Sequence, residues 1–283
     1  MTLGFIGLGN IGRPMARRLA SSGTRLFVHD TDPAACAALA DVAEPAGSIS
    51  AIGETCSHIA ICVRNDAEVR NVVEGAGGLL PALKSRTRTV IAIHSTIGLD
   101  TLLDLAAKAA AAGAELVDAA VTGGADIAAR GTLTAMIGGE PGIADRVRPL
   151  MSAYASNIIH AGPLGSGMKL KVANNLVTYT QLAVAVEAMR LVRVSGADPQ
   201  QLVAVMRANG NLTPAMDAYL KARADGAAKG NMLELLNFQK GLASLAEKDL
   251  DHALATAAAS GVSTPIGAQI RALFRATVER IES

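Results

Sequence analysis

The 283-residue sequence has few aromatic residues and almost no excess of charge of either sign, and each of these shortages excludes a class of function. It contains no Trp, three Tyr and four Phe, so aromatic platforms that stack single-stranded nucleic acid are not expected. Its 26 basic and 25 acidic residues are interspersed and give a net charge of +1. We therefore expect the protein to bind neither nucleic acid nor an anionic membrane surface.

Cysteine is also scarce: Cys36, Cys56 and Cys62 form neither an even disulfide set nor a zinc-binding spacing. We interpret them as small hydrophobic residues in a reducing compartment, and we expect no metal site. The N-terminus lacks the basic segment of a signal peptide. The most apolar stretch, near 172–194, contains Asn, Gln, Glu and Arg, which favours a buried helix over a membrane span. The predicted location is the cytoplasm.

The length of the chain predicts two domains, because 283 residues are many for one hydrophobic core. Over the first 160 residues, short β-rich runs alternate with Ala-rich helical stretches, which is typical of βαβ units and a mostly parallel sheet. The predicted strands are Leu3–Ile6, Arg25–His29, Ile59–Val63, Thr89–Ile93, Leu116–Asp118, Thr132–Ile137 and Asn157–His160. The sequence thus predicts a Rossmann-type α/β dinucleotide-binding domain over residues 1–162.

A Gly/Pro-rich segment at 161–167 ends this alternation, and no strand pattern follows it. A long helix is predicted over about 168–195, before Gly196, and another over 240–260. Further helices are predicted where a capping residue precedes a proline, at Asp198-Pro199, Thr213-Pro214 and Thr264-Pro265. We predict an all-helical C-terminal domain over residues 163–283, joined to the first through the long helix.

The segment GFIGLGNIGRPMARRLA places Gly7, Gly9 and Gly12 in a G-x-G-x-x-G array between a predicted strand and a predicted helix. In such an array the first glycine permits a tight turn, the second lets the backbone approach a pyrophosphate, and the third lets helix and strand pack closely. The helix N-terminus then faces the phosphate charge. The array predicts dinucleotide binding by Gly7, Leu8, Gly9, Asn10, Ile11 and Gly12.

Asp30 ends the predicted strand RLFVHD, 18 positions after Gly12. A carboxylate there accepts hydrogen bonds from the ribose hydroxyls and repels a 2′-phosphate. Thr31 and Asp32 follow and offer no cation to that phosphate, so NAD is favoured as the cofactor and NADP is the alternative. Asp30 could instead cap the next helix, a role that Asp32 before Pro33 would also suit.

Loops after other strands supply further candidates, because open α/β sheets bind ligands at the carboxyl ends of their strands. Two such loops are predicted to line the cofactor site, at Val63, Arg64 and Thr96. A third loop, at Thr122, Gly123 and Gly124, could present a hydroxyl and unshielded N–H groups to an anion. A tight turn between strands would suit the Gly-Gly pair equally well.

The segment GSGMKLKVANNL (165–176) carries two lysines, and helical geometry separates them. Residues four apart share a helix face, so Lys171 projects with Asn175, whereas Lys169 points away. Reduction of a carbonyl by a hydride leaves an oxygen that needs a proton, and a lysine held beside an amide could supply it. On spacing alone, a lysine that extends into solvent is an equal alternative.

Together these segments resemble the β-hydroxyacid dehydrogenase family, which includes 3-hydroxyisobutyrate dehydrogenase and tartronate semialdehyde reductase. The family pattern is G-x-G-x-x-G, D-A-P-V-S-G-G, G-x-G-x-x-x-K-x-x-x-N and a later K-D. This chain has GLGNIG, DAAVTGG, GSGMKLKVANN and EKDL in that order, over nearly its whole length. The resemblance implies an NAD(P)-dependent dehydrogenase that reversibly oxidises a small 3-hydroxy acid to its semialdehyde.

The resemblance also implies roles for individual residues. Lys171 would be the general acid/base, and Asn175 its partner at the substrate. The carboxylate of the substrate would be held by Thr122, Gly123 and Gly124. The dinucleotide would be contacted by Val63, Arg64, Thr96 and Lys248.

The chain departs from the family pattern in places. Ala120 replaces the usual proline of the substrate loop, Thr122 replaces the usual serine, and Arg64 stands where a proline is frequent. Gly241, seven residues before Lys248, occupies a position that is usually aromatic. We expect these departures to change the choice of substrate and to leave the chemistry intact.

Other functions share this two-domain plan. Imine reductases of similar architecture typically lack the catalytic lysine, so Lys171 argues against that activity. A non-catalytic NAD-binding scaffold is expected to have lost the Lys–Asn pair, which is intact here. The expected ligands are the dinucleotide and a small carboxylate, and the apolar helical half predicts a homodimer or a homotetramer.

Overall fold

A computed structural model describes residues 1–83 and 89–280. The chain divides into two compact units, and the division falls between Lys171 and Val172, inside one long helix. The first unit is α/β and the second is helical, which confirms the predicted fold class. The domain boundary after residue 162 stays a prediction.

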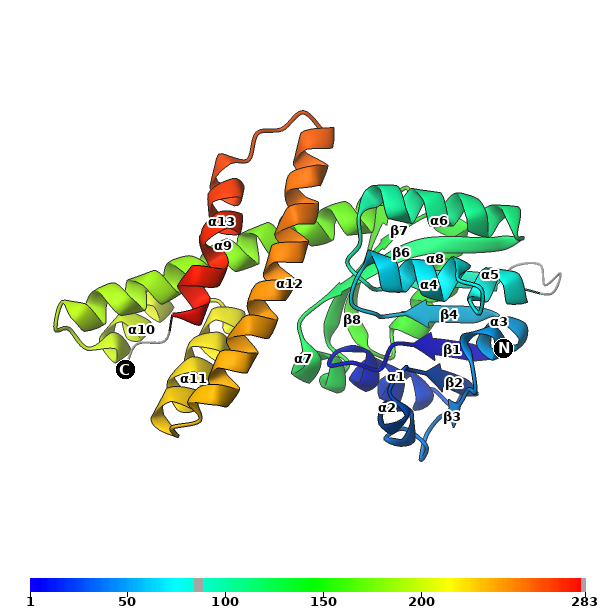
Figure 1. Ribbon diagram of the computed structural model, residues 1–283, viewed down its shortest axis with the longest axis horizontal. Helices are drawn as coiled ribbons and strands as arrows, with labels where there is room; N and C mark the ends of the chain where they lie inside the picture. The colour runs from blue at the N-terminus through cyan, green and yellow to red at the C-terminus, as the bar shows by residue number, and fades with distance from the viewer. Residues whose placement is uncertain (84–88, 281–283) are drawn as a thin grey trace. The chain divides into compact units, whose positions relative to one another are not determined.

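The described strands of the first unit form one eight-stranded sheet in the order β3-β2-β1-β4-β5-β6-β7-β8 (Figure 1). Adjacent strands are parallel except for the antiparallel pair β6 and β7. The strands are β1 (Leu3–Ile6), β2 (Leu26–His29), β3 (Glu44–Pro45), β4 (His58–Ile61), β5 (Thr89–Ile93), β6 (Ala114–Thr122), β7 (Leu133–Gly138) and β8 (Ala155–Gly162).

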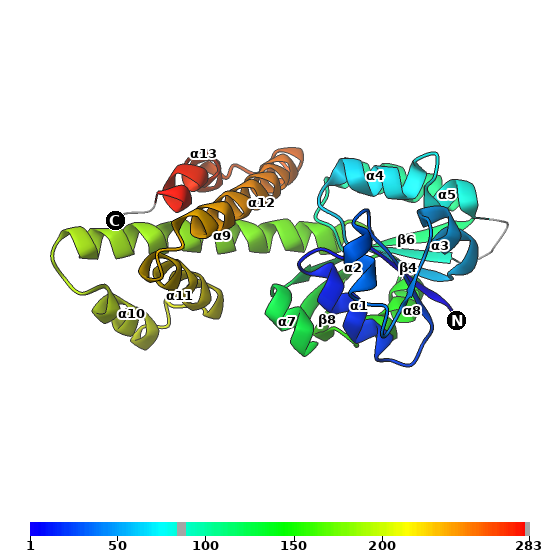
Figure 2. The same ribbon diagram turned by 60° about the horizontal axis from the view of Figure 1, so that its bottom comes forward.

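Helices cover both faces of this sheet, and each face has its own hydrophobic core (Figure 2). One core includes side chains of α1 (Gly12–Ala20), α2 (Pro33–Ala37), α7 (Ala125–Arg130) and α8 (Pro141–Met151). The other includes side chains of α3 (Ile49–Thr55), α4 (Asp66–Glu74), α5 (Leu79–Ala82) and α6 (Leu99–Ala111). Because both faces are buried, strands such as β5 read as continuous apolar runs instead of alternating with polar residues.

Strand β6 is longer than the predicted Leu116–Asp118. Its first half pairs with β5 up to Asp118, and its second half, to Thr122, pairs with β7. The second half therefore depends on an antiparallel partner that lies beyond α7 in the chain, and no local pattern signals such pairing.

The imidazole of His94 is buried directly after β5. Its Nδ1 lies 2.6 Å from the carbonyl oxygen of Ala119, and the Tyr154 hydroxyl lies 3.2 Å from its Nε2. A carbonyl can only accept, so Nδ1 carries the proton and Nε2 accepts from Tyr154. The ring stacks on Phe5, with centroids 6.2 Å apart. Burial lowers the pKa of His94 to about 4.

We expect this depressed pKa to destabilise the fold in weak acid. Between the ordinary pKa of 6.5 and the folded-state value of about 4, the unfolded chain binds a proton that the folded chain does not. The free energy of unfolding should therefore decrease as the pH falls, with a contribution from His94 of about 2.5 kcal/mol by pH 4.5. Urea unfolding at pH 7 and pH 4.5 measures this loss. His94→Gln should lose less stability over the same interval, and an equal loss in both proteins would contradict the assignment.

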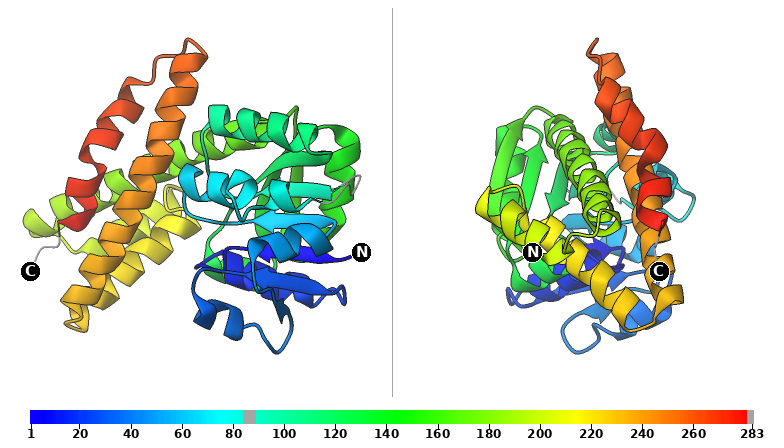
Figure 3. Two further views of the ribbon diagram at one scale, coloured as in Figure 1. Left: turned by 45° about the vertical axis from the view of Figure 1, so that its right-hand side comes forward. Right: turned by 90° about the vertical axis from the view of Figure 1, so that its left-hand side faces the viewer.

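The second unit continues the long helix α9 (Ser166–Val194) and adds four more helices. They are α10 (Pro199–Ala208), α11 (Pro214–Ala228), α12 (Met232–Ala259) and α13 (Pro265–Glu279). Side chains from all five pack in one apolar core. Figure 3 shows α12 and α13 side by side as an antiparallel pair, which is also joined by an ion pair between Arg271 Nε and Asp251 Oδ1 at 2.7 Å.

Two of the three predicted helix starts have the expected caps. Asp198 accepts a hydrogen bond from the Gln200 N–H at 2.8 Å, and Thr213 accepts one from the Met216 N–H at 3.2 Å. Thr264 makes no such bond. The helix predicted over 240–260 begins earlier, at Met232. Its N-cap residue, Asn231, makes no side-chain cap bond, so this start lacks the local signal that marks the others.

Two further features concern only the described residues. None of their helices is long and apolar enough to cross a membrane. No group of three His, Cys, Asp or Glu side chains among them is placed to hold a metal ion.

Candidate active site

The order of strands reverses beside β1. From β1 the chain proceeds outward to β2 and β3, and it then returns to β4 on the other side of β1. Open α/β sheets bind ligands in the crevice at the carboxyl ends of the strands where the order reverses. The G-x-G-x-x-G loop follows β1, and Val63 follows β4, which is parallel to β1. Both therefore lie at this edge.

The glycine loop packs tightly on one side and is open on the other. Gly7 has a φ of +94°, and a Cβ there would lie 2.3 Å from the carbonyl oxygen of Cys62. A Cβ on Gly12 would lie 2.0 Å from the carbonyl oxygen of Gly7, so the start of α1 packs directly on the loop. A Cβ on Gly9 would meet no atom within 4 Å. The space at Gly9 and the N-terminus of α1 fit the pyrophosphate of a dinucleotide.

The carboxylate of Asp30 is tied to the glycine loop. Its Oδ2 accepts a hydrogen bond from the Leu8 N–H at 2.6 Å, and its Oδ1 accepts one from the Asp32 N–H at 2.9 Å. Asp32, not Asp30, caps α2, by accepting from the Ala34 N–H at 2.9 Å. The alternative in which Asp30 serves as the helix cap is therefore wrong. Oδ1 also receives a long hydrogen bond, at 3.5 Å, from the Thr31 hydroxyl, whereas Oδ2 retains a lone pair that can accept from a ribose hydroxyl.

Arg64 points into solvent beside an acidic neighbour. Its side chain is 86 % exposed, and its Nε donates to Glu68 Oε1 at 2.7 Å. The nearby carboxylate of Asp30 adds to the attraction and helps to raise the pKa of Arg64, although the hydrogen bond to Glu68 is the main cause. Arg64, one of the two cations predicted for the cofactor site, is thus paired with a carboxylate.

Two side chains that sequence analysis does not identify fix the loops after β4 and β5. Ser95 is buried, and its Oγ accepts a hydrogen bond from the Val63 N–H at 2.8 Å. Asp66 Oδ1 accepts from the Gly98 N–H at 2.8 Å. These bonds hold the backbone on both sides of half-buried Thr96. The only local signal that a side chain fixes a loop backbone in this way is a small polar residue shortly after a strand.

The predicted substrate loop lies at the end of β6. Thr122 is the last residue of the strand, and Gly123 and Gly124 follow with φ of +138° and +85°. Helix α7 then separates β6 from β7, so the alternative of a tight turn between strands is wrong. Thr122 is half-buried and Gly123 is exposed, which leaves the hydroxyl and the adjacent backbone accessible.

Asp118, in the middle of β6, binds the start of α9. Its buried carboxylate accepts hydrogen bonds from the Gly165 N–H and the Met168 N–H, both at 2.7 Å. Burial raises the pKa of Asp118, and these hydrogen bonds oppose the shift. The strand that ends in the substrate loop is thereby tied to the helix that carries Lys171. No local pattern marks Asp118 for this role, because its partners are 47 and 50 residues away in the chain.

The two lysines of α9 have different surroundings. Lys169 is exposed, whereas Lys171 is half-buried. Burial raises the pKa of the Cys62 thiol to about 12, and the positive charge of Lys171 opposes that shift. The ammonium group therefore lies near the loop after β4, the same loop against which Gly7 packs.

Asn175 and Lys248 lie in the helical unit and share a partner. Buried Asn175 donates from Nδ2 to Asp249 Oδ2 at 2.7 Å. Lys248 Nζ lies 2.9 Å from Asp249 Oδ1. The contact predicted between Lys248 and the dinucleotide stays a prediction. Asp249 is a fourth residue, after Ser95, Asp66 and Asp118, to which the sequence pattern assigned no role.

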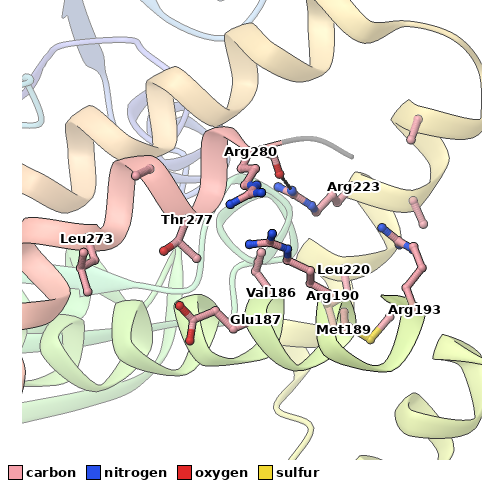
Figure 4. Close-up of a pocket in the computed structure, with 13 residues that line it drawn as sticks. Val186, Glu187, Met189, Arg190, Arg193, Leu220, Arg223, Leu273, Thr277 and Arg280 are labelled. Atoms are coloured by element: carbon pink, nitrogen blue, oxygen red, sulfur yellow. Dashed lines mark hydrogen bonds between the residues drawn. The ribbon is translucent and has the colours of Figure 1, made fainter. Parts of the chain in front are cut away.

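A cavity of about 450 Å³ in the helical unit contains none of the predicted site residues (Figure 4). It is lined by apolar side chains of α9, α11 and α13 and by four arginines, Arg190, Arg193, Arg223 and Arg280. Nη1 of Arg223 donates to the carbonyl oxygen of Val278 at 2.6 Å, which fixes one of these guanidinium groups. We assign this cavity no part in the predicted chemistry.

Comparison with known proteins matches both halves of the chain to described families. The NAD binding domain of 6-phosphogluconate dehydrogenase matches residues 2–162, and the NAD-binding domain of NADP-dependent 3-hydroxyisobutyrate dehydrogenase matches residues 165–283. The chain is 33 % identical over 281 residues to 3-hydroxyisobutyrate dehydrogenase of Pseudomonas aeruginosa, covering 96 % of this chain and 90 % of that one.

Solved structures give a similar result. The crystal structure of 3-hydroxyisobutyrate dehydrogenase from Salmonella typhimurium is matched with a TM-score of 0.83 at 26 % identity, covering 98 % of this chain and 93 % of that one. An imine reductase from Streptomyces aurantiacus is matched with a TM-score of 0.68 at 15 % identity, over 98 % and 94 % of the two chains. The second likeness is one of fold alone.

Proposed function

Because the chain belongs to the 3-hydroxyisobutyrate dehydrogenase family, we propose that it reversibly oxidises a small 3-hydroxy acid to its semialdehyde with NAD. The resemblance to β-hydroxyacid dehydrogenases is confirmed, and the protein is an NAD(P)-dependent dehydrogenase. The particular acid, the preference for NAD and the roles of individual residues are proposals.

One observation carries the proposed chemistry: the only half-buried lysine of the segment GSGMKLKVANNL is Lys171, and its charge acts on Cys62 beside the glycine loop. A proton-transfer group must lie next to the carbon that exchanges a hydride with the nicotinamide. Asn175, one helical turn after Lys171, supplies an amide on the same side of α9.

The proposed roles follow from these placements. In the oxidation, the Thr122 hydroxyl and the N–H groups of Gly123 and Gly124 hold the substrate carboxylate. Unprotonated Lys171 takes the proton of the substrate hydroxyl as the C–H bond breaks; bound NAD would supply the acceptor for the hydride that leaves that carbon. In the reduction, the Lys171 ammonium gives its proton to the aldehyde oxygen. The glycine loop and Asp30 hold the dinucleotide.

Charge supports the preference for NAD over NADP. Asp30 and Asp32 lie at the end of β2, and Glu68 offsets the charge of Arg64 nearby. A 2′-phosphate placed on the ribose at Asp30 would be repelled by these carboxylates. The preference is therefore proposed for this chain, although one matched family is described as NADP-dependent.

A screen of small 3-hydroxy acids tests the proposed function. Each acid is incubated with NAD or NADP, and reduced nicotinamide is followed by its absorbance. The matched control for each acid is its methyl ester, which keeps the hydroxyl and removes the carboxylate. We expect turnover of at least one acid and a large rise in KM for its ester. Equal turnover of acid and ester would contradict carboxylate recognition.

The same assay separates the alternative functions. Turnover of cyclic imines with NADPH and of no hydroxy acid would indicate an imine reductase, and NAD binding without turnover of any substrate would indicate a scaffold. Neither alternative uses Lys171 for proton transfer to an alkoxide. The cytoplasmic location and the homo-oligomeric state remain predictions.

A further inference from the structure

Asp249 is a buried carboxylate with three polar neighbours. It lies within α12 and is 2 % exposed. Its Oδ2 accepts hydrogen bonds from Asn175 Nδ2 at 2.7 Å and from the Tyr179 hydroxyl at 2.9 Å. Lys248 Nζ lies 2.9 Å from the other oxygen. Burial and the nearby carboxylate raise the pKa of Tyr179, so its hydroxyl is a neutral donor.

These contacts orient the amide of Asn175. Oδ2 of Asp249 accepts from Asn175 Nδ2, so the NH₂ group of Asn175 faces Asp249 and its carbonyl oxygen faces away. That oxygen receives a long hydrogen bond, at 3.4 Å, from Asn174 Nδ2. It retains a lone pair that can accept, and the spacing of four residues places Asn175 on the face of α9 that also carries Lys171. An acceptor suits an ammonium or a substrate hydroxyl, whereas the opposite orientation would direct N–H groups at them.

Burying the Asp249 carboxylate costs more free energy than a contact that only joins α9 and α12 would require. Leu182 of α9 and Leu250 of α12 belong to one apolar core and hold their helices without any charge. Burying a carboxylate requires that its lost hydration be replaced by hydrogen bonds and a counter-charge, and an apolar pair of similar volume is often as stable. The polar contact at Asp249 therefore indicates a role in orienting Asn175.

We infer that Asp249 is a positioning residue that holds the Asn175 amide with its carbonyl oxygen turned toward Lys171 and the reacting hydroxyl. This inference rests on the proposed function, in which Asn175 is the partner of Lys171. Asp249 itself touches no reacting atom, so its effect must pass through Asn175. A double-mutant cycle tests that dependence.

The cycle compares the full-length protein with Asn175→Ala, Asp249→Ala and the double variant. Turnover is counted per NADH-binding site, so that unfolded protein does not contribute. We expect Asp249→Ala to lower kcat by about 10-fold to 100-fold, because a small misplacement of a positioned group has an effect of that size. We expect the double variant to be no slower than Asn175→Ala. Independent effects that multiply in the double variant would overturn the inference.

Three more variants separate orientation from stability. Asp249→Asn keeps a carbonyl oxygen that can accept both hydrogen bonds, so it should recover most of the kcat lost in Asp249→Ala. Tyr179→Phe removes the other bond to the same oxygen and should lower Tm with kcat nearly unchanged. Lys248→Met removes the ion pair to Asp249 together with the proposed dinucleotide contact, so it should weaken NADH binding and lower kcat at saturating NADH less than Asp249→Ala does. If Asp249→Ala does not fold, Asp249→Leu, which fills the site, takes its place in the cycle.

These variants test the positioning role of Asp249 separately from the proposed role of Asn175 in the reaction. Normal kcat in Asn175→Ala would show that the proposed role of Asn175 is wrong, whatever Asp249 does. Reduced kcat in Asn175→Ala with normal kcat in Asp249→Ala would leave the proposed function standing and overturn the positioning role.

Discussion

Lys171→Ala is expected to lower kcat by about 10²-fold to 10⁴-fold, the usual contribution of a positioned general acid or base. The alanine variant lacks the ammonium group near the loop after β4 that is proposed to take the hydroxyl proton and return it. The dissociation constant of NADH should stay nearly unchanged, because the dinucleotide is proposed to be held by the glycine loop and Asp30. Steady-state kinetics gives kcat, and fluorescence titration of NADH gives the dissociation constant.

Lys169→Ala is the matched control, since it removes the same charge two residues earlier on the same helix. Lys169 is exposed and points away from Lys171, so its loss should leave kcat within about twofold of the wild-type value. Near-normal kcat in Lys171→Ala would show that another group transfers the proton. Equal losses in both variants would show that α9 needs positive charge in general and no particular lysine.

Local chemistry explains which parts of the fold sequence analysis predicts. The bounds of β1 and β5 are correct because both strands are buried on both faces and read as short apolar runs. The predicted starts of α10 and α11 are correct because each helix begins with a capping residue. Its side-chain oxygen accepts a hydrogen bond from a backbone N–H two or three residues later. Where a boundary depends on a distant strand, as in β6, or has no side-chain cap, as at the start of α12, the prediction is wrong.

The same distinction applies to the candidate site. Glycine loops can be identified from sequence because their backbone geometry demands glycine at fixed spacing, as the contacts of Gly7 and Gly12 illustrate. Asp118 and Asp249 are ordinary acidic residues, and their functions follow from partners 47 to 74 residues away. Ser95 is buried by the fold and holds Val63 through an Oγ that local sequence does not orient. Only the three-dimensional structure reveals such pairings.

Replacing Asp30 with Ser and Thr31 with Arg is expected to shift the ratio of kcat/KM toward NADP by about 10²-fold to 10³-fold. The serine removes the carboxylate that would repel a 2′-phosphate, and the arginine adds charge-assisted hydrogen bonds worth about 1.5–3 kcal/mol each. Thr31 is exposed, so the longer side chain has room. Kinetics with saturating substrate and varied NAD or NADP measures the change.

Some loss of NAD affinity should accompany this shift, because Asp30 also binds the Leu8 and Asp32 N–H groups. Asp32→Ser provides the control: it removes a carboxylate two residues away and leaves a hydroxyl that can still cap α2. If the negative charge acts at the ribose, only the change at Asp30 alters cofactor preference. Equal shifts in the two proteins would indicate a diffuse electrostatic effect. An unchanged ratio of kcat/KM for NADP and NAD in the double variant would show that other residues discriminate between the cofactors. Arg64 and its partner Glu68 would be the next positions to vary, because Arg64 lies close enough to Asp30 for their charges to interact.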